Sequence, residues 1–332
     1  MIKMKGKIIA VVMLLLLVAI TFGGSCAPTT PEEELPIKIG ILTTKSGPLA
    51  DHGKYADWGY SLAADELNEK GGILGRKVEL LWTDTKLKPD VALANAQSLI
   101  FDNEVDCLYG CFITSTASAV SSFCKEQKKI LITPACGTLL SEEKGHRYIF
   151  TVSSNNAMRN VANLISLEEL AAREGKVLKV WMVSPDYSFG HEAVEQVKAL
   201  QPKDAPHIVF VGESWPPYGE TDFAPYLTEI MKAQPDVILN YVFGGDLMAF
   251  TIQAKALGLF EKIKVVGDYS PESLRPMGLE APEGLIVTTW YAPGAFDSPV
   301  ARKFERAIQD KYGELPSWET ASAYTALTCL AK

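Results

Sequence analysis

Three consecutive hydroxyl side chains, Thr114, Ser115 and Thr116, stand where a predicted strand (105–110) gives way to a predicted helix (115–126). The first N–H groups of a helix lack intrahelical partners and carry partial positive charge, so this position attracts an anion. A single hydroxyl would be enough to cap the helix, and capping needs no ligand. Three hydroxyls in succession favour a carboxylate-binding site.

Two other turns that follow predicted strands also carry chemically active groups. Residues 46–53, with His52, join the first strand to the first helix, and residues 133–138, with Cys136, follow a later strand. Ligands of parallel α/β sheets bind beyond the carboxyl ends of the strands. The three turns together therefore predict a ligand-binding cleft.

Motifs for covalent chemistry are incomplete in this sequence. Residues 47–54 resemble a phosphate-binding loop, but five residues separate its glycines where the motif has four, and Tyr55 replaces the magnesium-binding Ser or Thr. His191 and Glu192 match the start of the zinc-protease motif H-E-x-x-H, but Glu195 stands where that motif needs its second histidine. There is no G-x-S-x-G motif and no G-x-G-x-x-G after a strand. We therefore predict no catalytic residues, no metal site and no cofactor.

The elements that must position the three turns alternate regularly. Predicted strands lie at 37–42, 77–82, 105–110, 129–133, 148–152, 177–183, 207–212, 236–242, 264–267 and 284–290. Predicted helices lie at 55–70, 89–101, 115–126, 156–174, 190–200, 222–233, 246–257, 298–312 and 318–332. This alternation indicates an α/β fold with parallel sheets and helices on both faces. So many strands are too many for one small sheet, so we predict two doubly wound parallel-sheet lobes.

Composition excludes several classes of protein. The 332 residues suffice for two mid-sized domains, and 47% hydrophobic with 22% charged residues exclude wholesale disorder. A formal net charge of −8 argues against a nucleic-acid partner, because no basic surface is available for phosphates. Only one long apolar run occurs, at the N-terminus, which excludes a protein with several membrane spans.

The N-terminal segment is typical of a secretory leader. Three lysines precede a 13-residue apolar run, 8–20, and small residues follow it. A permanent membrane helix is the alternative, but the run is short for a bilayer core.

The end of this segment resembles a bacterial lipobox, with Ser25 before Cys26, although Gly23 stands where that pattern prefers an aliphatic residue. The resemblance implies a lipoprotein signal peptide at 1–26, with Cys26 as the lipidated residue. Residues 27–36, rich in Pro and Glu, then form a tether. Loss of the three leader lysines leaves 29 basic and 40 acidic residues, a net charge of −11.

Five cysteines remain beyond Cys26, and their odd number argues against a complete disulfide framework. Cys107 and Cys111 are about 13 Å apart in an extended strand, too far to form a disulfide. No Cys or His pair follows them at the spacing of a zinc site. We expect these cysteines to be small buried hydrophobic residues.

Several stretches, in order along the chain, resemble the periplasmic binding proteins of ABC transporters, in the leucine/isoleucine/valine and amide-binding group. Residues 37–53 resemble the opening strand and S-G-P turn of that family, and residues 63–80 its first helix, paired glycines and second strand. Further matching stretches are KILITPACG (129–137), DYSFGHE (186–192), TDFAPYL (221–227) and APEGLIVTT (281–289). The similarity spans residues 37–332.

This resemblance implies two lobes that close on a ligand about a hinge of three crossovers. Lobe 1 would comprise residues 37–151 and 287–332, and lobe 2 residues 152–286. Members of the family usually continue for several tens of residues beyond the position where this sequence stops, which implies a truncated C-terminus.

The resemblance also implies which residues bind the ligand. Hydroxyl and backbone groups of the second and third turns would hold a carboxylate, His52 takes the place of an aromatic residue in the first turn, and lobe 2 adds aromatic rings. The residues concerned are His52, Thr114, Ser115, Thr116, Ala135, Cys136, Gly137, Phe189, Tyr241 and Phe243. Gly137 departs from the family, which has Thr there.

Amino-acid binders of this family place an acid after the strand corresponding to 264–267, where it pairs with the ligand ammonium. Tyr269 stands at that position here, and Asp268 comes one residue early. Asp268 either reaches the ligand or only forms the turn. In the second case the ligand would lack an α-amino group, since a buried ammonium would have no partner. Trp290 and Tyr291 either line the cleft or pack in the core, and Tyr291 is the one we favour as a cleft-lining residue.

The function implied is that of a monomeric, lipid-anchored solute-binding protein, located in the periplasm or at the outer face of the cytoplasmic membrane. Its ligand would be a small polar molecule, such as an amino acid, an amide or a carboxylate, and its partner an ABC permease. Contact with the membrane would be through the lipid anchor only, with no nucleic acid involved. A sensory protein that presents its ligand to a membrane receptor is the alternative, and an envelope enzyme, which would turn the ligand over, is a third hypothesis.

Overall fold

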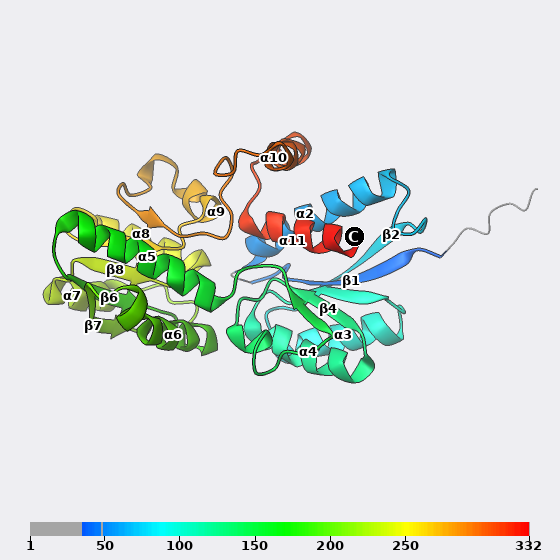
Figure 1. Ribbon diagram of the computed structural model, residues 1–332, viewed down its shortest axis with the longest axis horizontal. Coiled ribbons are helices and arrows are strands. Elements are labelled where there is room, and N and C mark those ends of the chain that lie inside the picture. The colour runs from blue at the N-terminus through cyan, green and yellow to red at the C-terminus, as the bar shows by residue number, and fades with distance from the viewer. Residues whose placement is uncertain (1–34, 48, 332) are drawn as a thin grey trace, which may run out of the picture. The chain divides into compact units, whose positions relative to one another are not determined.

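The computed structural model describes residues 35–47 and 49–331. The predicted signal peptide, its Cys26 and most of the predicted tether lie outside the described residues. Ten strands form two five-stranded sheets within one compact unit, Pro36–Lys332 (Figure 1). Every pair of neighbouring strands is parallel, as the strand–helix alternation predicts.

Lobe 1 is built on the first sheet, whose strand order is β2-β1-β3-β4-β5. Its strands are β1 (Ile37–Thr43), β2 (Val78–Asp84), β3 (Cys107–Gly110), β4 (Ile130–Thr133) and β5 (Ile149–Thr151). Its helices are α2 (Ala50–Glu69), α3 (Pro89–Phe101), α4 (Thr114–Gln127), α10 (Pro299–Tyr312) and α11 (Trp318–Leu330), with the short η1 (Thr138–Leu140).

Alternation along β1 divides the core of lobe 1 between the two faces of the sheet. Ile39 and Ile41 pack in one cluster with residues of α2 and α11, while Leu42 packs in another with residues of α3 and α4. Helices therefore cover both faces of this sheet, and its ligand-facing edge is the edge where the strands end.

Lobe 2 is built on the second sheet, whose strand order is β10-β9-β8-β6-β7. Its strands are β6 (Leu178–Val183), β7 (Ile208–Ser214), β8 (Val237–Asn240), β9 (Lys264–Gly267) and β10 (Ile286–Val287). Its helices are α5 (Asn156–Glu174), α6 (Ser188–Asp204), α7 (Ala224–Ala233), α8 (Gly244–Ala256) and α9 (Pro271–Leu274), with η2 (Arg275–Glu280). Residues of α5 and α6 fill the core on one face, and residues of α7 and α8 fill it on the other.

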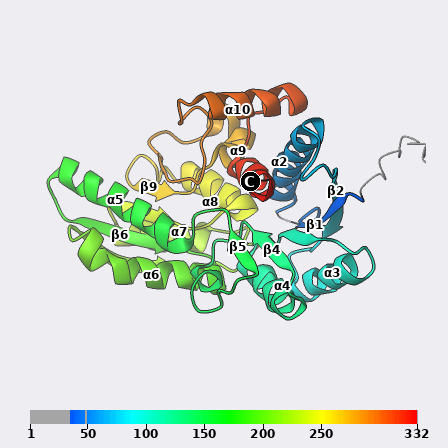
Figure 2. The ribbon, with the colours of Figure 1, turned by 45° about the vertical axis from the view of Figure 1, so that its right-hand side comes forward.

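The C-terminal helix α11 lies beside α2, from the opposite end of the sequence (Figure 2). Gly59 of α2 permits this approach: a Cβ atom there would come within 2.2 Å of the Thr320 carbonyl oxygen and 2.9 Å of the Ala323 Cβ. The close packing brings the first turn of α11 next to the first turn of α2, and both turns contribute to the site described below.

The chain passes between the lobes after β5 and again after β10, and the two passages are hydrogen-bonded. Trp290 Nε1 donates to the Ser154 carbonyl oxygen at 3.0 Å, and Thr288 Oγ1 donates to Asn163 Oδ1 at 2.6 Å. The third crossover implied by the family resemblance is not among the residues that the structure describes. Among the residues that the structure describes, no helix has the length and apolarity needed to cross a membrane.

Helix α5 has the bounds that the sequence predicts, because both of its ends carry strong local signals. Asn155 Oδ1 accepts a hydrogen bond from Met158 N at 3.0 Å, and Gly175 ends the helix with a φ of +64°. Helix α2, by contrast, begins five residues before the predicted start, and its N-cap Leu49 makes no side-chain capping bond. His52 therefore lies in a helix, where we had expected a turn.

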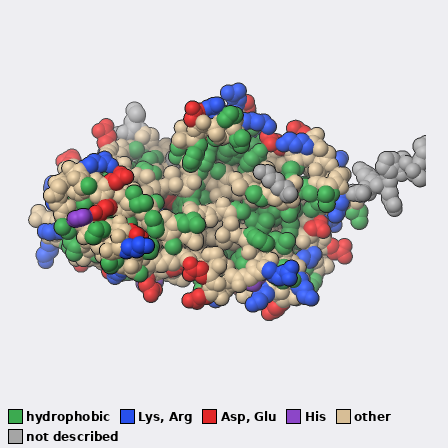
Figure 3. Space-filling model, in the orientation of Figure 1, with side chains coloured by type: hydrophobic (Ala, Val, Ile, Leu, Met, Phe, Trp, Pro, Cys, Tyr) green, Lys and Arg blue, Asp and Glu red, His purple; other side chains and the backbone are tan. Residues whose placement is uncertain are grey.

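Acidic and basic side chains are interspersed over the face shown in Figure 3. That face thus lacks the continuous basic surface by which proteins hold nucleic-acid phosphates.

Candidate ligand-binding site

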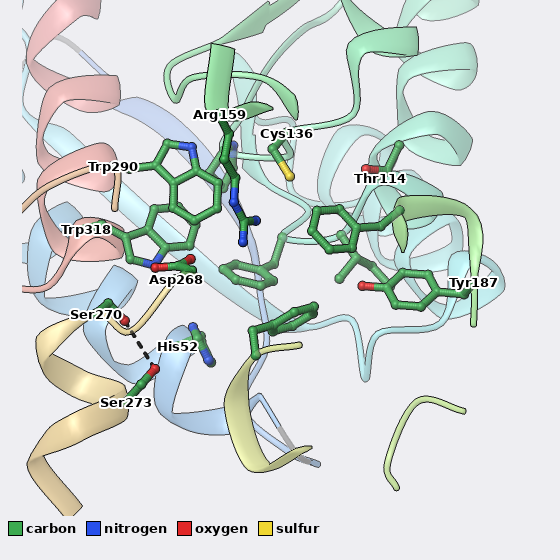
Figure 4. A pocket seen from close by; sticks show the side chains of 15 residues that line it. His52, Thr114, Cys136, Arg159, Tyr187, Asp268, Ser270, Ser273, Trp290 and Trp318 are labelled. Atoms are coloured by element: carbon green, nitrogen blue, oxygen red, sulfur yellow. Dashed lines mark hydrogen bonds between the residues drawn. The ribbon is translucent and has the colours of Figure 1, made fainter. Parts of the chain in front are cut away.

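Fifteen residues line a cavity where the strand ends of the two sheets face each other (Figure 4). Lobe 1 contributes His52, Phe112, Ile113, Thr114, Pro134, Cys136 and Trp318. Lobe 2 and the second passage contribute Arg159, Tyr187, Phe189, Phe243, Asp268, Ser270, Ser273 and Trp290.

Aromatic rings make up most of the cavity wall. Trp290 and Trp318 lie with ring centroids 4.6 Å apart, and Phe112 lies 5.6 Å from Trp318. From lobe 2, Phe189 packs edge-on against Phe243 at 5.7 Å. Such walls favour a ligand with a flat or apolar body.

Arg159 enters this wall from the first turn of α5. Its side chain reaches into the cavity close to Trp290 (Figure 4), and its guanidinium lies 4.8 Å from the Trp290 ring centroid and 5.7 Å from that of Phe189. Arg159 is only 7% exposed, and its Nε and Nη2 atoms have no hydrogen-bond partner among the described residues. Aromatic faces thus stabilise the charge, while one edge of the guanidinium remains without an acceptor.

Asp268, directly after β9, is a second buried charged group. It is 6% exposed, and its Oδ1 has no hydrogen-bond partner in the described part of the chain. Burial raises the pKa of its carboxyl from 3.8 to about 6, although the positive charge of Arg159 lowers it. At neutral pH Asp268 is therefore mainly a carboxylate with a free acceptor in the cavity.

His52 is held in place by a buried acid from α11. Its Nδ1 is hydrogen-bonded to Glu319 Oε1, and Ser317 Oγ donates to Glu319 Oε2 at 2.6 Å. Glu319 is 2% exposed, so this bond fixes the imidazole ring at the cavity wall. The close packing of α2 and α11 makes the contact possible. Next to His52, Gly53 lets α2 approach the end of β1, because an added Cβ would overlap the Thr44 carbonyl oxygen at 1.7 Å.

Six of the residues singled out from the sequence line the cavity: His52, Thr114, Cys136, Phe189, Phe243 and Asp268. The other six do not lie among the lining residues.

Four of these six come from the hydroxyl-rich second turn and the third turn. Ser115 is exposed, and Thr116 is buried with its Oγ1 donating to the Ile113 carbonyl at 2.8 Å. Gly137 packs against Thr114, and an added Cβ would lie 2.3 Å from Thr114 Cγ2. Ala135 is also buried. Of the three hydroxyls, Thr114 alone faces the cavity, and the N-cap position of α4 is Ile113, which makes no side-chain capping bond.

Tyr241 and Tyr269 lie in the core of lobe 2. The Tyr241 hydroxyl donates to Asn160 Oδ1 at 2.7 Å, and its ring centroid lies 5.4 Å from the Arg159 guanidinium, so it supports the site from behind. Tyr269 packs in the cluster formed with α7 and α8, and its hydroxyl accepts from Asn240 Nδ2 at 3.3 Å. Side chains alternate sides in an extended chain, so Asp268 faces the cavity and Tyr269 faces the core.

Trp290, rather than the favoured Tyr291, forms part of the wall. The Tyr291 hydroxyl donates to Glu305 Oε1 at 2.7 Å, and its ring packs on Phe304 of α10. A one-residue offset again decides which of two neighbouring aromatic side chains meets the cavity.

Sequence reasoning missed Arg159, although a signal for it exists. Asn156, Arg159, Asn160 and Asn163 share the buried face of α5, at the i, i+3, i+4, i+7 spacing of a helical stripe. Polar residues at core-facing positions are costly unless they have partners, so this stripe marks a site. Other lining residues outside the prediction are Phe112, Ile113, Pro134, Tyr187, Ser270, Ser273 and Trp318.

Cysteines provide neither a metal site nor a reactive thiol at the cavity. Cys107, Cys111 and Cys124 are buried and unbridged, as expected, whereas Cys329 is exposed. Burial raises the pKa of the Cys136 thiol to about 11, so it stays protonated at neutral pH. Within residues 35–331 the structure contains no cluster of metal-binding side chains.

Contacts outside the cavity join the two lobes. Glu192 Oε1 of α6 accepts from Thr138 N at 2.7 Å, and Gln196 Nε2 donates to Thr138 Oγ1 at 2.8 Å. On another side of the cavity, Arg275 forms an ion pair with Glu314. These contacts hold the lobes together, so the structure represents a closed form.

Comparison with known proteins agrees with this architecture. A family model described as periplasmic binding protein matches residues 36–332. The Leu/Ile/Val-binding protein homolog 7 of Brucella abortus is 26% identical, over 84% of this chain and 72% of that protein.

Solved structures show the same fold. A branched-chain amino acid transporter substrate binding protein from Streptococcus pneumoniae, in complex with isoleucine, has a TM-score of 0.79 and 22% identity, over 89% of this chain and 83% of that one. An ABC-transporter solute binding protein from Rhodopseudomonas palustris, in complex with 3,4-dihydroxy benzoic acid, has a TM-score of 0.77 and 24% identity, over 90% and 79% of the two chains. Together with the family match over 36–332, the two parallel-sheet lobes establish that this chain belongs to the periplasmic binding protein family.

Proposed function

We propose that this chain is the solute-binding component of an ABC uptake system, which captures a small ligand between its lobes and delivers it to a permease unchanged. One observation carries the proposal: the cavity between the lobes contains two buried charged side chains, Arg159 and Asp268, with polar atoms that lack a partner among the described residues. Buried polar groups are nearly always hydrogen-bonded, so such atoms point to a ligand.

The ligand that these groups support contains a carboxylate. Relatives are named for binding leucine, isoleucine and valine, and one structural neighbour holds 3,4-dihydroxy benzoic acid. An amino acid, an amide or another carboxylate is therefore the class we propose for this chain. Arg159 would meet an anionic group and Asp268 a hydrogen-bond donor.

Closure of the two lobes supplies both affinity and the signal to the permease. In an open form the cavity would be wet, and closure would transfer the ligand to a site where its charged hydrogen bonds are stronger. The hydrogen-bonded passages at Ser154 and Trp290 would form the hinge. A permease that recognises the closed arrangement then receives loaded protein only.

The groups at the cavity support binding rather than covalent chemistry. The Cys136 thiol is protonated, the Ser270 and Ser273 hydroxyls pair at 3.2 Å, and His52 Nδ1 is occupied by Glu319. We therefore propose that the protein is not an enzyme. The monomeric state that the family resemblance implies is a separate part of this proposal.

We further propose that the mature protein lies outside the cytoplasmic membrane and is anchored through a lipid on Cys26. The support is the leader pattern of residues 1–26 and the family of the remaining chain. Cys26→Ser should release the protein from the membrane fraction into the soluble extracytoplasmic fraction, whereas Cys329→Ser should leave it membrane-bound. Equal fractionation of the Cys26 variant and the wild type would contradict the anchor.

Thermal unfolding of the mature chain against a panel of amino acids, amides and carboxylates tests the function. A ligand at roughly 1,000 times its dissociation constant adds about 4 kcal/mol to the free energy of unfolding, so the midpoint should rise by several degrees. The ligand should be recovered unchanged after incubation. Chemical conversion of the ligand, or no shift with any compound of the panel, would contradict the proposal.

A further inference from the structure

The unpartnered edge of Arg159 has the geometry of a carboxylate receptor. In a guanidinium, the Nε–H and one N–H of Nη2 point in the same direction, and these are the two nitrogen atoms of Arg159 that lack partners in the part of the chain that the structure describes. Two parallel N–H donors match the two oxygens of a carboxylate. A side chain that is 7% exposed cannot satisfy this edge with bulk water.

The surroundings of Arg159 keep this edge available. The guanidinium lies near three aromatic rings, with Trp290 at 4.8 Å, Tyr241 at 5.4 Å and Phe189 at 5.7 Å from their centroids. Rings interact with the cation but do not accept in-plane N–H bonds as strongly as a carboxylate does. Arg159 is therefore held in place without consuming its donors.

The electrostatics of the helices point the same way. Thr114 begins α4, Trp318 begins α11, and Arg159 and Phe189 lie in the first turns of α5 and α6. The positive ends of these helices meet at the cavity, which favours an anion beside the arginine.

Whereas Arg159 requires an acceptor on the ligand, Asp268 requires a donor. Its Oδ1 has no partner within residues 35–47 and 49–331 and is buried in the same cavity, so the ligand must also carry a hydrogen-bond donor. The donor and the carboxylate must be separate groups, because Arg159 and Asp268 do not satisfy each other. The cavity that contains both groups is walled mainly by rings, including the Trp290–Trp318 pair and Phe243.

From these contacts we propose that the cavity selects an aromatic carboxylate, bound through Arg159 Nε and Nη2, with a hydroxyl or ammonium of the ligand donating to Asp268. The inference rests on the proposed function and narrows its ligand class. Hydroxybenzoates and aromatic amino acids share this chemistry, and the test separates them.

Isothermal titration with 4-hydroxybenzoate, benzoate, L-phenylalanine, L-leucine and benzamide distinguishes these possibilities. At least one of 4-hydroxybenzoate and L-phenylalanine should bind at least tenfold more tightly than L-leucine, and benzamide should bind weakly or not at all. A preference for 4-hydroxybenzoate identifies the donor as a hydroxyl, and a preference for L-phenylalanine identifies it as an ammonium. Leucine binding as tightly as the better aromatic compound would overturn the inference.

Variants of Arg159 test its role directly. Arg159→Gln should lower the affinity for the best aromatic carboxylate by about 100-fold, which is the loss expected when charge-assisted hydrogen bonds are removed. Arg159→Lys, which keeps the charge without the two-donor edge, should restore only part of the affinity. Arg173→Gln is the matched control, because it removes the same charge from an exposed position of α5 and should change affinity less than twofold. Wild-type affinity in both Arg159 variants would refute the assignment.

Asp268→Asn completes the test. It should reduce the preference for the donor-bearing compound over its analogue without the donor, since the carboxylate contact at Arg159 is untouched. An unchanged preference would overturn the role of Asp268. If only an amide or aliphatic compound from the thermal panel binds, this inference fails while the proposed function stands.

Discussion

Among single residues, Arg159 and Asp268 contribute most to the chemistry of the cavity, and they differ in how visible they are in the sequence. Asp268 follows a strand, where a ligand contact is expected, and what had to be decided was which of Asp268 and Tyr269 faces the cavity. Arg159 lies inside a helix, and its importance follows from the buried polar stripe that it shares with three asparagines. A search for helical spacing detects such a stripe only if polar residues, and not apolar residues alone, are counted as members of the buried face.

Burial of Asp268 makes stability depend on pH in a definite direction. Its pKa is raised from 3.8 to about 6, so the folded protein holds the proton more tightly than the unfolded chain. The contribution of this group to the free energy of unfolding is therefore greatest below pH 4, and it falls as the pH rises from about 4 to about 6.

Asp268→Asn removes this penalty. Without ligand, the variant should gain up to about 3 kcal/mol relative to the wild type between pH 4 and pH 7. Denaturant unfolding of both proteins at several pH values measures the difference and cancels the titration of other groups, such as the partly buried Asp57. A difference that does not vary between pH 4 and pH 7 would contradict the burial of a charged Asp268.

At the scale of elements, the contact between α2 and α11 positions the lobe 1 side of the site. It places Glu319 against His52, and it depends on the absence of a side chain at Gly59. Sequence periodicity predicts both helices but contains no information that they touch, because they lie at opposite ends of the chain.

Gly59→Ala should therefore destabilise the protein and weaken ligand binding. The added Cβ meets the Thr320 carbonyl oxygen at 2.2 Å, and backbone atoms cannot rotate away, so we expect a loss of about 1–3 kcal/mol or more. Chemical denaturation and ligand titration measure the two effects.

Gly245→Ala in α8 is the control, because no atom lies within 4 Å of its added Cβ. It should be neutral or stabilise the helix by up to about 1 kcal/mol. Equal effects of the two substitutions would show that helix propensity, and not the α2–α11 contact, is responsible.

The bounds of most elements are predicted well, with the start of α2 as an exception, and the elements that the prediction missed are short. Strand β9 and helix α5 agree with the prediction residue by residue, since hydrophobic pattern and capping coincide there. The segments η1, α9 and η2 have at most six residues, too few for a periodic pattern. Two of them neighbour the cavity, so its rim is the part least accessible from sequence.

On the scale of the whole molecule, the contacts between the lobes outside the cavity should favour the closed form. The double variant Glu192→Ala/Arg275→Ala removes one contact on each side of the cavity. Because the hydrogen bond from Thr138 N to Glu192 and the ion pair of Arg275 with Glu314 should contribute up to about 1 kcal/mol each, ligand affinity should fall by roughly 3- to 30-fold.

Lys311→Ala is the control for this effect, because it removes an ion pair between α10 and α2 within lobe 1. Ligand titration should show wild-type affinity for it. A loss of affinity in the control as large as that in the double variant would mean that general electrostatics, and not closure, are responsible.

The architecture of two lobes follows from the sequence, because strand–helix alternation and the number of strands leave few alternatives. The closed arrangement does not, since it depends on pairs such as Glu192 with Thr138 that are far apart in the chain. Identity of the ligand likewise depends on side chains that several separate elements bring together.

Small-angle X-ray scattering of the mature protein, with and without the ligand found in the thermal panel, measures closure most directly. Saturating ligand should reduce the radius of gyration and make the scattering curve match that of the closed structure, while Arg159→Gln should require far more ligand for the same change. An identical scattering curve with and without saturating ligand would contradict capture by closure of the two lobes.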